Sequence, residues 1–532
     1  MSATSRRPSE LAPQEWLFLG LVVLFWSGFV IALGKDTSWD FRNYHWYVPY
    51  AFLNGRMGLD VAVAHQATYY NPLLDVPFYW LATHTHSWFA IGALGAVQGT
   101  NVVPLYLIAR EAVRVEETKL AAGALALLGV TGALTVSLYG TTYYDNVMSV
   151  FLLTALALVV VKRDELRQGR LVRAGMITAI GGFLGGCAVG LKLPEAPFAL
   201  GFAAALVALG GDLKHQATRL VAGGLGGVAG FALCAGWWML RMQHLTGNPL
   251  FPYFNEYFRS GLALAAPYRD MRFVPTHFWR AVLFPLLFSI DWHVADDLGF
   301  QDIRVGAAYI LSLAVAGLAL FGRRAKDPLM DGRATIPVIA FAGVSYIVWL
   351  KIFAIYRYIL CLEMLSPLLI ATAIGLMPLS RRSRLVGIAC VFFAILLVTR
   401  SEFIERAPLG DPYVQVALPP IADPQKAMAL MTGDGPLGFL APAIPHRIPL
   451  LRIDGWMVQP NDGTRMTRGM RARVADHLKR GGSLYLVADA FDMTRASEAL
   501  TDYGLAIVWT ECRLFDTNLS GTYQFCPVVP RR

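Results

Sequence analysis

About eleven apolar runs recur along the first 400 residues of this chain. A helix needs roughly 20 apolar residues to cross the hydrocarbon core of a bilayer. The composition agrees, because 55% of the residues are hydrophobic and only 16% are charged, against about a quarter charged in soluble domains. The predicted spans are 16–34, 87–109, 120–139, 146–161, 174–191, 195–210, 220–240, 303–321, 334–350, 358–378 and 385–400. The sequence therefore predicts an all-α polytopic membrane protein.

Charge in the connections sets the expected topology. With the N-terminus inside, about 19 Lys and Arg residues, among them Arg6, Arg7 and Arg324, fall on one side, against about 12 in the longer connections opposite. The net charge of +9 is thus explained by the positive-inside rule and does not indicate a nucleic-acid partner. We expect a multi-pass protein of a bacterial cytoplasmic membrane. Its connections 35–86, 139–145, 192–195, 241–302 and 351–357 and its tail 401–532 should be extracytoplasmic, or periplasmic.

Two parts follow from this pattern: a transmembrane module, 1–400, and a soluble tail, 401–532. In the tail, Thr467–Arg480 and Asp492–Tyr503 have helical patterns, while Ser483–Ala488 and Leu505–Trp509 have the character of strands. A small extracytoplasmic α/β domain is predicted. Cys512 and Cys526 lie in this tail, where an oxidising compartment favours a disulfide, although two free buried thiols are the alternative.

The first connection, 35–86, is dense in ionisable and aromatic residues. Asp36 and Asp40 follow the first span, together with Arg42, Asn43 and His45. Aromatic residues within 42–54 predict an interfacial helix on the membrane surface. A second polar patch contains His65, Tyr70, Asn71 and Asp75. Charges at a span end cost little, so these carboxylates have a simple alternative as helix-end markers.

The other connections supply further candidates. Asp145 opens a helix and is either an N-cap or a ligand. Lys192 and Glu195 flank Pro194 and either pair with each other or meet an anion at the membrane surface. The connection between two late spans contains Lys351, Tyr356 and Arg357. Arg357 either extends its charged end from the membrane into water or binds a phosphate. Loop 241–302 carries several Arg and His residues and is expected to be a solvated loop, partly facing a substrate. No Walker A, G-x-S-x-G or H-E-x-x-H pattern is present.

This layout, with the text Asp40-Phe41-Arg42-Asn43-Tyr44-His45, Leu53-Asn54-Gly55-Arg56 and Tyr70-Asn71-Pro72-Leu73-Leu74-Asp75, resembles the GT-C superfamily of membrane glycosyltransferases. It looks like a bacterial branch related to glycosyltransferase family 87. The likeness covers roughly residues 16–400. It implies a sugar donor carried on polyprenyl phosphate and an acceptor that is a cell-envelope glycan, a lipid or a protein.

The resemblance also implies roles for single residues. Asp40, or less favourably Asp36, would be the catalytic base. Asp145 would correspond to a residue that binds a divalent metal, Mg²⁺ or Mn²⁺, in some branches, and Arg357 to a phosphate-binding arginine. The second loop lacks a clear Asp-x-Asp, which leaves metal dependence open. The expected substrate-binding residues are Arg42, Asn43, His45, His65, Tyr70, Asn71, Asp75, Lys192, Glu195, Lys351, Tyr356 and Arg357.

Other functional classes remain open at this point. A transporter or flippase of a lipid-linked substrate would need charged residues within the spans or repeated halves, and Glu363 is the only charge that stands out there. A polysaccharide polymerase or ligase would use the cations of loop 241–302. A membrane-anchored scaffold, with the tail as its functional part, would not explain the polar cluster of the first connection.

Overall fold

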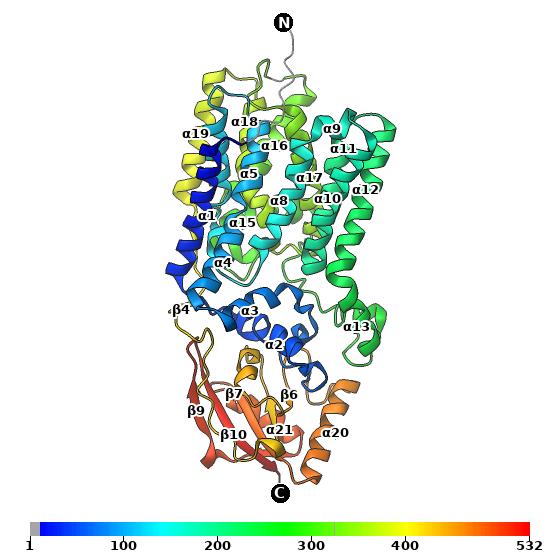
Figure 1. Cartoon of the computed structure of the whole chain (residues 1–532), viewed down its shortest axis with the longest axis vertical. Helices are drawn as coiled ribbons and strands as arrows, with labels where there is room; N and C mark the ends of the chain where they lie inside the picture. The colour runs from blue at the N-terminus through cyan, green and yellow to red at the C-terminus, as the bar shows by residue number, and fades with distance from the viewer. Residues whose placement is uncertain (1–10, 324, 532) are drawn as a thin grey trace.

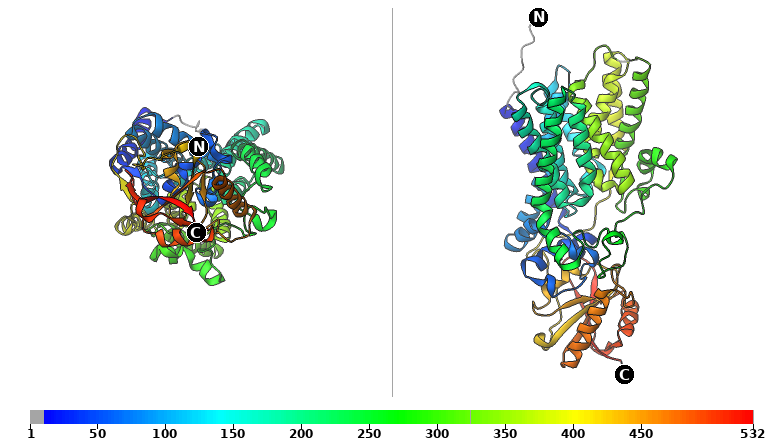
Figure 2. Two further views of the ribbon diagram at one scale, coloured as in Figure 1. Left: turned by 90° about the horizontal axis from the view of Figure 1, so that it is seen from below. Right: turned by 90° about the vertical axis from the view of Figure 1, so that its right-hand side faces the viewer.

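The chain is elongated, with a helical bundle at one end, the α/β tail at the other and the first loop (residues 35–86) between them (Figure 1). This computed structural model describes residues 11–323 and 325–531. Arg6, Arg7 and Arg324, which contribute to the charge asymmetry of the sequence, lie outside the described residues. A side view separates the same three layers along the long axis (Figure 2).

Within the described ranges, six helical stretches are long and apolar enough to cross a membrane. They are α1 (Pro13–Leu33), α4 with α5 (Ser87–Gly99 and Val102–Ala112), α10 (Leu171–Leu191), α12 through α13 (Leu213–Phe231 and Trp237–Thr246), α17 (Gly332–Ile352) and Tyr356–Leu376, which contains α18 (Leu360–Leu376). The other bundle helices are α6 (Thr118–Gly129), α7 (Ala133–Ser137), α8 (Asp145–Val161), α9 (Arg163–Gln168), α11 (Ala196–Ala208), α15 (Phe278–Ile290), α16 (Arg304–Leu320) and α19 (Arg381–Val398), and the short α14 (Asn255–Phe258) lies in loop 247–277. A mostly helical membrane protein is therefore supported, and the count of eleven spans stays a prediction.

The boundaries of several spans differ from the sequence expectation. The run predicted as 220–240 belongs to a helical stretch that continues to Thr246, so the first residues of loop 241–302 are helical. Arg241 and His244 made that end look like a loop, although polar residues at the end of a helix can reach water without ending it. Close packing holds this stretch against α10. A Cβ added at Gly182 or Gly186 would come within 2.0 Å of the carbonyl oxygen of Gly223 or Gly227, the contact that small residues permit between membrane helices.

The first loop is a folded wedge of short elements. They are β1 (Lys35–Asp36), the π-helical turn η1 (Phe41–His45), α2 (Tyr47–Leu53), η2 (Arg56–Gly58), η3 (His65–Tyr69), η4 (Pro72–Leu74) and α3 (Val76–His84). The prediction that 42–54 lies on the membrane surface is wrong for its aromatic residues. Trp46, Tyr47 and Tyr50 are buried in the protein, because the tail packs against the side of this segment that the sequence predicted to lie on the membrane surface.

The tail is built on a mixed sheet. Its strand order is β6-β5-β7-β10-β8, with β9 paired to β10. The strands are β5 (Ala427–Met431), β6 (Leu450–Arg452), β7 (Ser483–Asp489), β8 (Leu505–Ile507), β9 (Arg513–Asp516) and β10 (Thr522–Pro530), with helices α20 (Arg465–Lys479) and α21 (Met493–Asp502). The structure contains both helices and both strands predicted from the sequence. The other four strands lacked a clear pattern, being short or rich in proline.

The tail is tied into the rest of the fold at several points. After α19, β3 (Arg400–Ser401) pairs with β2 (Phe300–Gln301), and β4 (Arg406–Ala407) pairs with β1. Val61 of the first loop forms a bridge with Leu451 on β6, so the loop extends the sheet. One core cluster runs from the bundle through the first loop into the tail. The predicted boundary near residue 400 thus marks the end of α19. The hydrophobic core continues across it, from the bundle into the tail.

Two buried arginines fasten the first loop to the tail. Arg56 pairs with Asp60, with an Nη2–Oδ1 distance of 2.7 Å, and donates to the carbonyl oxygens of His446 and Ile448. Arg452 donates to the carbonyl oxygen of Val63 at 3.0 Å. These contacts make the loop and the tail one packed unit.

Within the tail, Cys512 and Cys526 form a disulfide. This is the pairing that the sequence favoured. It joins the segment before β9 to β10.

Candidate active-site cavity

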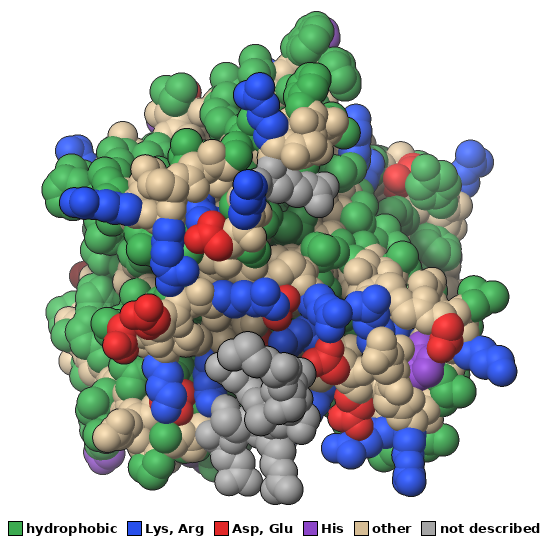
Figure 3. All heavy atoms as spheres, turned by 90° about the horizontal axis from the view of Figure 1, so that it is seen from above, with side chains coloured by type: hydrophobic (Ala, Val, Ile, Leu, Met, Phe, Trp, Pro, Cys, Tyr) green, Lys and Arg blue, Asp and Glu red, His purple; other side chains and the backbone are tan. Residues whose placement is uncertain are grey.

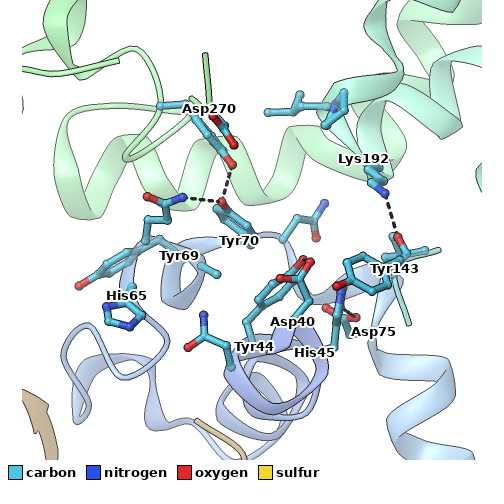
Figure 4. A pocket seen from close by; sticks show the side chains of 18 of the residues that line it. Asp40, Tyr44, His45, His65, Tyr69, Tyr70, Asp75, Tyr143, Lys192 and Asp270 are labelled. Carbon is cyan, nitrogen blue, oxygen red and sulfur yellow. Dashed lines mark hydrogen bonds and ion pairs between the residues drawn. The ribbon is translucent and has the colours of Figure 1, made fainter. Parts of the chain in front are cut away.

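A cavity of about 1060 Å³ lies where the first loop meets the tail-facing end of the bundle. Its walls come from the first loop, the end of α10, α13, loop 247–277, the turn before α18 and the tail, which contributes Ile404, Glu405 and Trp456. Figure 4 shows Asp40 and Tyr44 rising from the first loop, with Lys192 and Asp270 on the opposite side of the space. Residues far apart in sequence are thus gathered around one volume, which is the usual geometry of a binding site.

Asp40 is presented to the cavity by an unusual backbone segment. Gly34 has a φ of +95°, and a Cβ there would meet the carbonyl oxygen of Ala407 at 2.4 Å, so only glycine allows the turn that ends α1. The chain then pairs with β4 and enters the π-helical turn 41–45, a feature that often marks functional sites. Asp40 lines the cavity and is half-buried.

The Tyr44 hydroxyl donates a hydrogen bond to Oδ2 of Asp40 at 3.0 Å. Burial raises the pKa of Tyr44 well above its usual value, and the negative charge of Asp40 raises it further. Tyr44 therefore keeps its proton and remains a donor. This hydrogen bond fixes one carboxylate oxygen of Asp40, Oδ2, beside the cavity.

Asp36 does not share this position. It is fully buried, and its Oδ2 accepts hydrogen bonds from the backbone and the hydroxyl of Thr142 at 2.8 and 3.0 Å. Its Oδ1 accepts one from the backbone of Ser38, and the residue is absent from the cavity wall. The expectation that Asp36 acts as a catalytic base is therefore wrong, because its oxygens fasten the first loop to the connection 139–145.

Arg357 brings a permanent positive charge to the cavity. Its backbone N–H donates to Oδ2 of the buried Asp296 at 2.8 Å, while its Nη1 lies 3.8 Å from Oδ1 of the same carboxylate. The guanidinium lies over the rings of Tyr143 and Tyr358, 5.1 and 5.3 Å from their centroids. Its charge interacts with that of Asp40. The long contact to Asp296 leaves most guanidinium donors available to a ligand.

Lys192 also lines the cavity, and its ammonium is bound on one side. It donates to the carbonyl oxygen of Tyr143 at 2.8 Å and forms an ion pair with Asp145. The partner of Lys192 is therefore Asp145, while Glu195 lies buried beside this pair and outside the cavity wall. Asp145 is absent from the cavity wall, and its ion pair with Lys192 already balances its charge.

Throughout residues 11–323 and 325–531, no group of three or more His, Cys, Asp or Glu side chains is arranged to hold a metal ion.

His45 and Asp75 form a buried pair at the floor of the cavity, with 2.6 Å between Nδ1 and Oδ1. Burial raises the pKa of Asp75, and the neighbouring His45 opposes that rise. The Nε2 atom of His45 is buried and has no hydrogen-bond partner. The pair supports η1 from below, because it joins that turn to the start of α3.

Five more sequence candidates also line the cavity, but most of their polar atoms serve the fold. Arg42 reaches the carbonyl oxygen of Ser520 and the hydroxyl of Tyr523 in the tail. Asn43 donates to the carbonyl oxygen of Ala64 at 3.3 Å. These hydrogen bonds join η1 to the tail and to the rest of the first loop, while both residues also line the cavity.

The remaining three lie along the second polar patch. Tyr70 hydrogen-bonds to Tyr253, and Asn71 donates to the carbonyl oxygen of Cys234 at 2.8 Å. His65 contacts Nη1 of Arg452 at 2.9 Å through Nε2. Burial, and then the charge of Arg452, lowers the pKa of His65 well below its usual value. His65 is therefore neutral near pH 7.

Besides Glu195, two predicted substrate-binding residues lie outside the cavity wall. Lys351 is exposed at the end of α17 and does not reach the cavity. Tyr356 is fully buried and stacks on Phe300 with 4.2 Å between ring centroids. These two expectations are wrong, because the turn before α18 presents Arg357 and Tyr358 to the cavity and directs Tyr356 into the core.

Several residues of the wall were not identified as site residues from the sequence. Tyr143, Tyr253, Arg269 and Asp270 line the cavity, and so does Trp456 from the tail. Arg269 and Asp270 belong to a loop that looked solvated, and Trp456 is an isolated aromatic in a turn. Their approach to Asp40 depends on tertiary packing, for which the sequence carries no local signal.

The chain has no match among protein-family models, among curated proteins or among solved structures.

Proposed function

We propose that this protein is an integral membrane glycosyltransferase that moves a sugar from a polyprenyl-phosphate donor to an acceptor outside the cytoplasm. The observation that carries the proposal is that Asp40 and the cations Arg357 and Lys192 line one cavity. A base and a phosphate-binding group must flank the anomeric carbon in such a transfer. The resemblance to the GT-C superfamily supports the same conclusion from the sequence.

The wall of the cavity also suits a lipid-borne donor. Leu191, Ala235, Met239 and Met242, at the ends of two apolar helical stretches, line the bundle side of the cavity. The polyprenyl chain would leave the site on this side, between helices that face lipid. The phosphate would then meet Arg357, whose planar guanidinium is suited to bidentate contact with phosphate oxygens.

In the proposed reaction, the acceptor hydroxyl gives its proton to Asp40 as its oxygen attacks the anomeric carbon. The bond between that carbon and the phosphate oxygen breaks, and the bond electrons leave with the polyprenyl phosphate. Arg357 and Lys192 stabilise the charge that develops on the phosphate. A single displacement of this kind inverts the anomeric configuration.

The proposed orientation places the tail outside a bacterial cytoplasmic membrane. Lys and Arg side chains are spread over the end of the bundle farthest from the tail (Figure 3). Arg114 lies between α5 and α6, Lys119 is at the start of α6 and Arg163 is at the start of α9. An excess of positive charge is typical of the cytoplasmic side. The cavity then opens on the side where envelope glycans, lipids and secreted proteins are available as acceptors.

A transporter or flippase is the competing proposal. Its strongest support would be the buried charges of the bundle, Asp302, Arg304 and Glu363. Arg304 pairs with Asp302 at 2.8 Å, and Glu363 accepts hydrogen bonds from the backbone and the hydroxyl of Thr135 at 2.9 and 2.6 Å. Because none of the three charged residues lines the cavity, they have the geometry of a structural network, which favours the transferase.

A polymerase or ligase that uses the cations of loop 241–302 is closer to the proposed reaction. Arg269 and Arg272 line the cavity, and Arg272 is paired with Asp270 and Asp297, each at 2.6 Å. That pairing leaves Arg357 more available to a phosphate than Arg272. Analysis of the product, a single added sugar or an extended chain, separates the two reactions.

The test is Asp40→Asn in the full-length protein, expressed in a deletion strain whose envelope glycans are then analysed. We expect loss of the product with normal abundance and thermal stability, because Asn keeps the shape but cannot accept the proton. Asp291→Asn, an exposed carboxylate outside the cavity, is the control and should restore the product. Full product from Asp40→Asn would reject the proposal.

A further inference from the structure

The tail contributes one large aromatic side chain to the cavity, Trp456. Its ring stacks on that of Trp39, with 4.8 Å between centroids and 8° between planes. It also lies nearly parallel to His65, at 5.4 Å and 17°. The three rings come from two segments of the first loop and from the tail, so this aromatic platform (Trp39, His65 and Trp456) exists only when the tail is docked.

Trp456 is nevertheless 56% exposed. A tryptophan that served only to fix the tail would gain more by burying both faces. Because one face is covered by the stack, the exposed surface includes a flat apolar face at the wall of the cavity. Flat aromatic faces of this kind suit ligands with an apolar face and a polar rim, a description that fits the C–H face and hydroxyl rim of a pyranose ring.

Polar groups lie near the platform at the carboxyl end of the parallel strands. Asp434 follows β5 and Asp454 follows β6, and Arg495 holds both carboxylates at 2.6 Å. In open α/β sheets this edge is where ligands bind. Asp454 is two residues from Trp456, and its ion pair with Arg495 fixes the turn that carries the platform tryptophan.

The cavity also has two chemically different sides. Apolar residues and the cations Lys192 and Arg357 line the bundle side, while Trp39, Trp456 and Glu405 come from the first loop and the tail. Asp40 directly follows Trp39, and both side chains reach the same space. A donor entering from the bundle side would therefore leave the platform side for the molecule that receives the sugar.

From this arrangement we propose that the platform is the acceptor subsite, and that the acceptor is a neutral saccharide whose ring stacks on Trp456. The assignment of this ligand as the acceptor rests on the proposed glycosyltransferase function. The exposed carboxylate of Glu405, in the part of the wall that the tail supplies, disfavours an anionic ring. The tail acts in this view as the part that binds the acceptor, and docking of the tail completes the site.

The test measures binding of soluble neutral hexasaccharides of glucose, mannose, galactose and N-acetylglucosamine to the full chain in lipid nanodiscs, by calorimetry. We expect millimolar or tighter binding of at least one probe, weakened about tenfold by Trp456→Ala. Trp456→Tyr should keep most of the affinity. Trp509→Ala, which alters a tail tryptophan of similar exposure outside the cavity, is the matched control and should bind as the wild type.

Two results would overturn the subsite: no binding of any probe by the wild type, or equal affinity in wild type and Trp456→Ala. Undecaprenyl phosphate binding, measured in the same nanodiscs, tests the donor side separately. Loss of hexasaccharide binding in Trp456→Ala with normal undecaprenyl phosphate binding supports both proposals. If the hexasaccharide result holds but Arg357→Ala leaves undecaprenyl phosphate binding unchanged, the saccharide subsite stands and the donor assignment fails.

Discussion

The buried pair Arg56 and Asp60 predicts how strongly the first loop depends on the tail. Both side chains are inaccessible to solvent. The Asp60 carboxylate accepts hydrogen bonds from Nε and Nη2 of Arg56 at 2.8 and 2.7 Å. It also accepts hydrogen bonds from the Tyr47 hydroxyl and the Leu450 backbone N–H, each at 3.1 Å. Replacing Asp60 by Asn removes the charge that balances the guanidinium and keeps the shape.

The expected cost follows from these contacts. Removing one partner of a buried ion pair destabilises a protein by about 3–5 kcal/mol, because the other charge is left uncompensated. Asn retains one hydrogen-bond acceptor, so we expect Asp60→Asn to lower the free energy of unfolding by the smaller value of this range, about 3 kcal/mol. The double variant Arg56→Met/Asp60→Asn should cost less than the sum of the single changes, since no buried charge remains.

Thermal unfolding of the detergent-solubilised full chain measures this effect. Asp60→Asn should lower the unfolding temperature by several degrees and increase proteolysis between the loop and the tail. Lys479→Ala removes an exposed pair with 4.0 Å between charged atoms and should cause no measurable change. Equal stability of Asp60→Asn and wild type would refute the view that this pair fastens the two parts together.

Three further predictions follow from the site and the tail. Because the pKa of His65 in the fold lies well below its ordinary value near 6.5, the unfolded chain binds a proton first as the pH falls. Stability should then drop below pH 6.5 by up to about 1.4 kcal/mol per pH unit, and a His65→Asn variant should show a shallower slope in unfolding experiments at pH 6.5 and 5.5. Arg357→Ala should reduce sugar transfer by about 10²–10³-fold, and Arg357→Lys should recover only part of it; wild-type rates in either variant would contradict the role of the guanidinium. Cys512 and Cys526 enclose a short loop with a sequence separation of 14, so the double Ser variant should lose about 3 kcal/mol of tail stability, and an unfolding curve unaffected by dithiothreitol would count against it.

The sequence was most informative where local pattern determines structure. The helical period of 467–480 and the apolar strand 483–488 predicted α20 and β7 because each buries one face of its own element. Apolar runs similarly predicted the long bundle helices. Asp40 was identified because a carboxylate just after a span, in a dense polar cluster, needs an explanation beyond solubility.

The sequence was least informative where two distant segments meet. The aromatics near Trp46 and Tyr50 have the composition of an interfacial helix, and only the docked tail makes them core residues. Asp36 and Asp40 are chemically alike and four residues apart, and their different environments depend on Thr142, which lies in another connection. Trp456 carried no signal, because its importance comes from the ring of Trp39 on which it stacks.

The most direct test of the central claim is sugar transfer by purified Asp40→Asn protein in nanodiscs, with membrane extract of the deletion strain as the source of donor and acceptor. The account predicts a rate at least about 10²-fold below wild type, with undecaprenyl phosphate binding and thermal stability unchanged. A rate equal to wild type in this variant would show that Asp40 is not the base and would contradict the proposed mechanism.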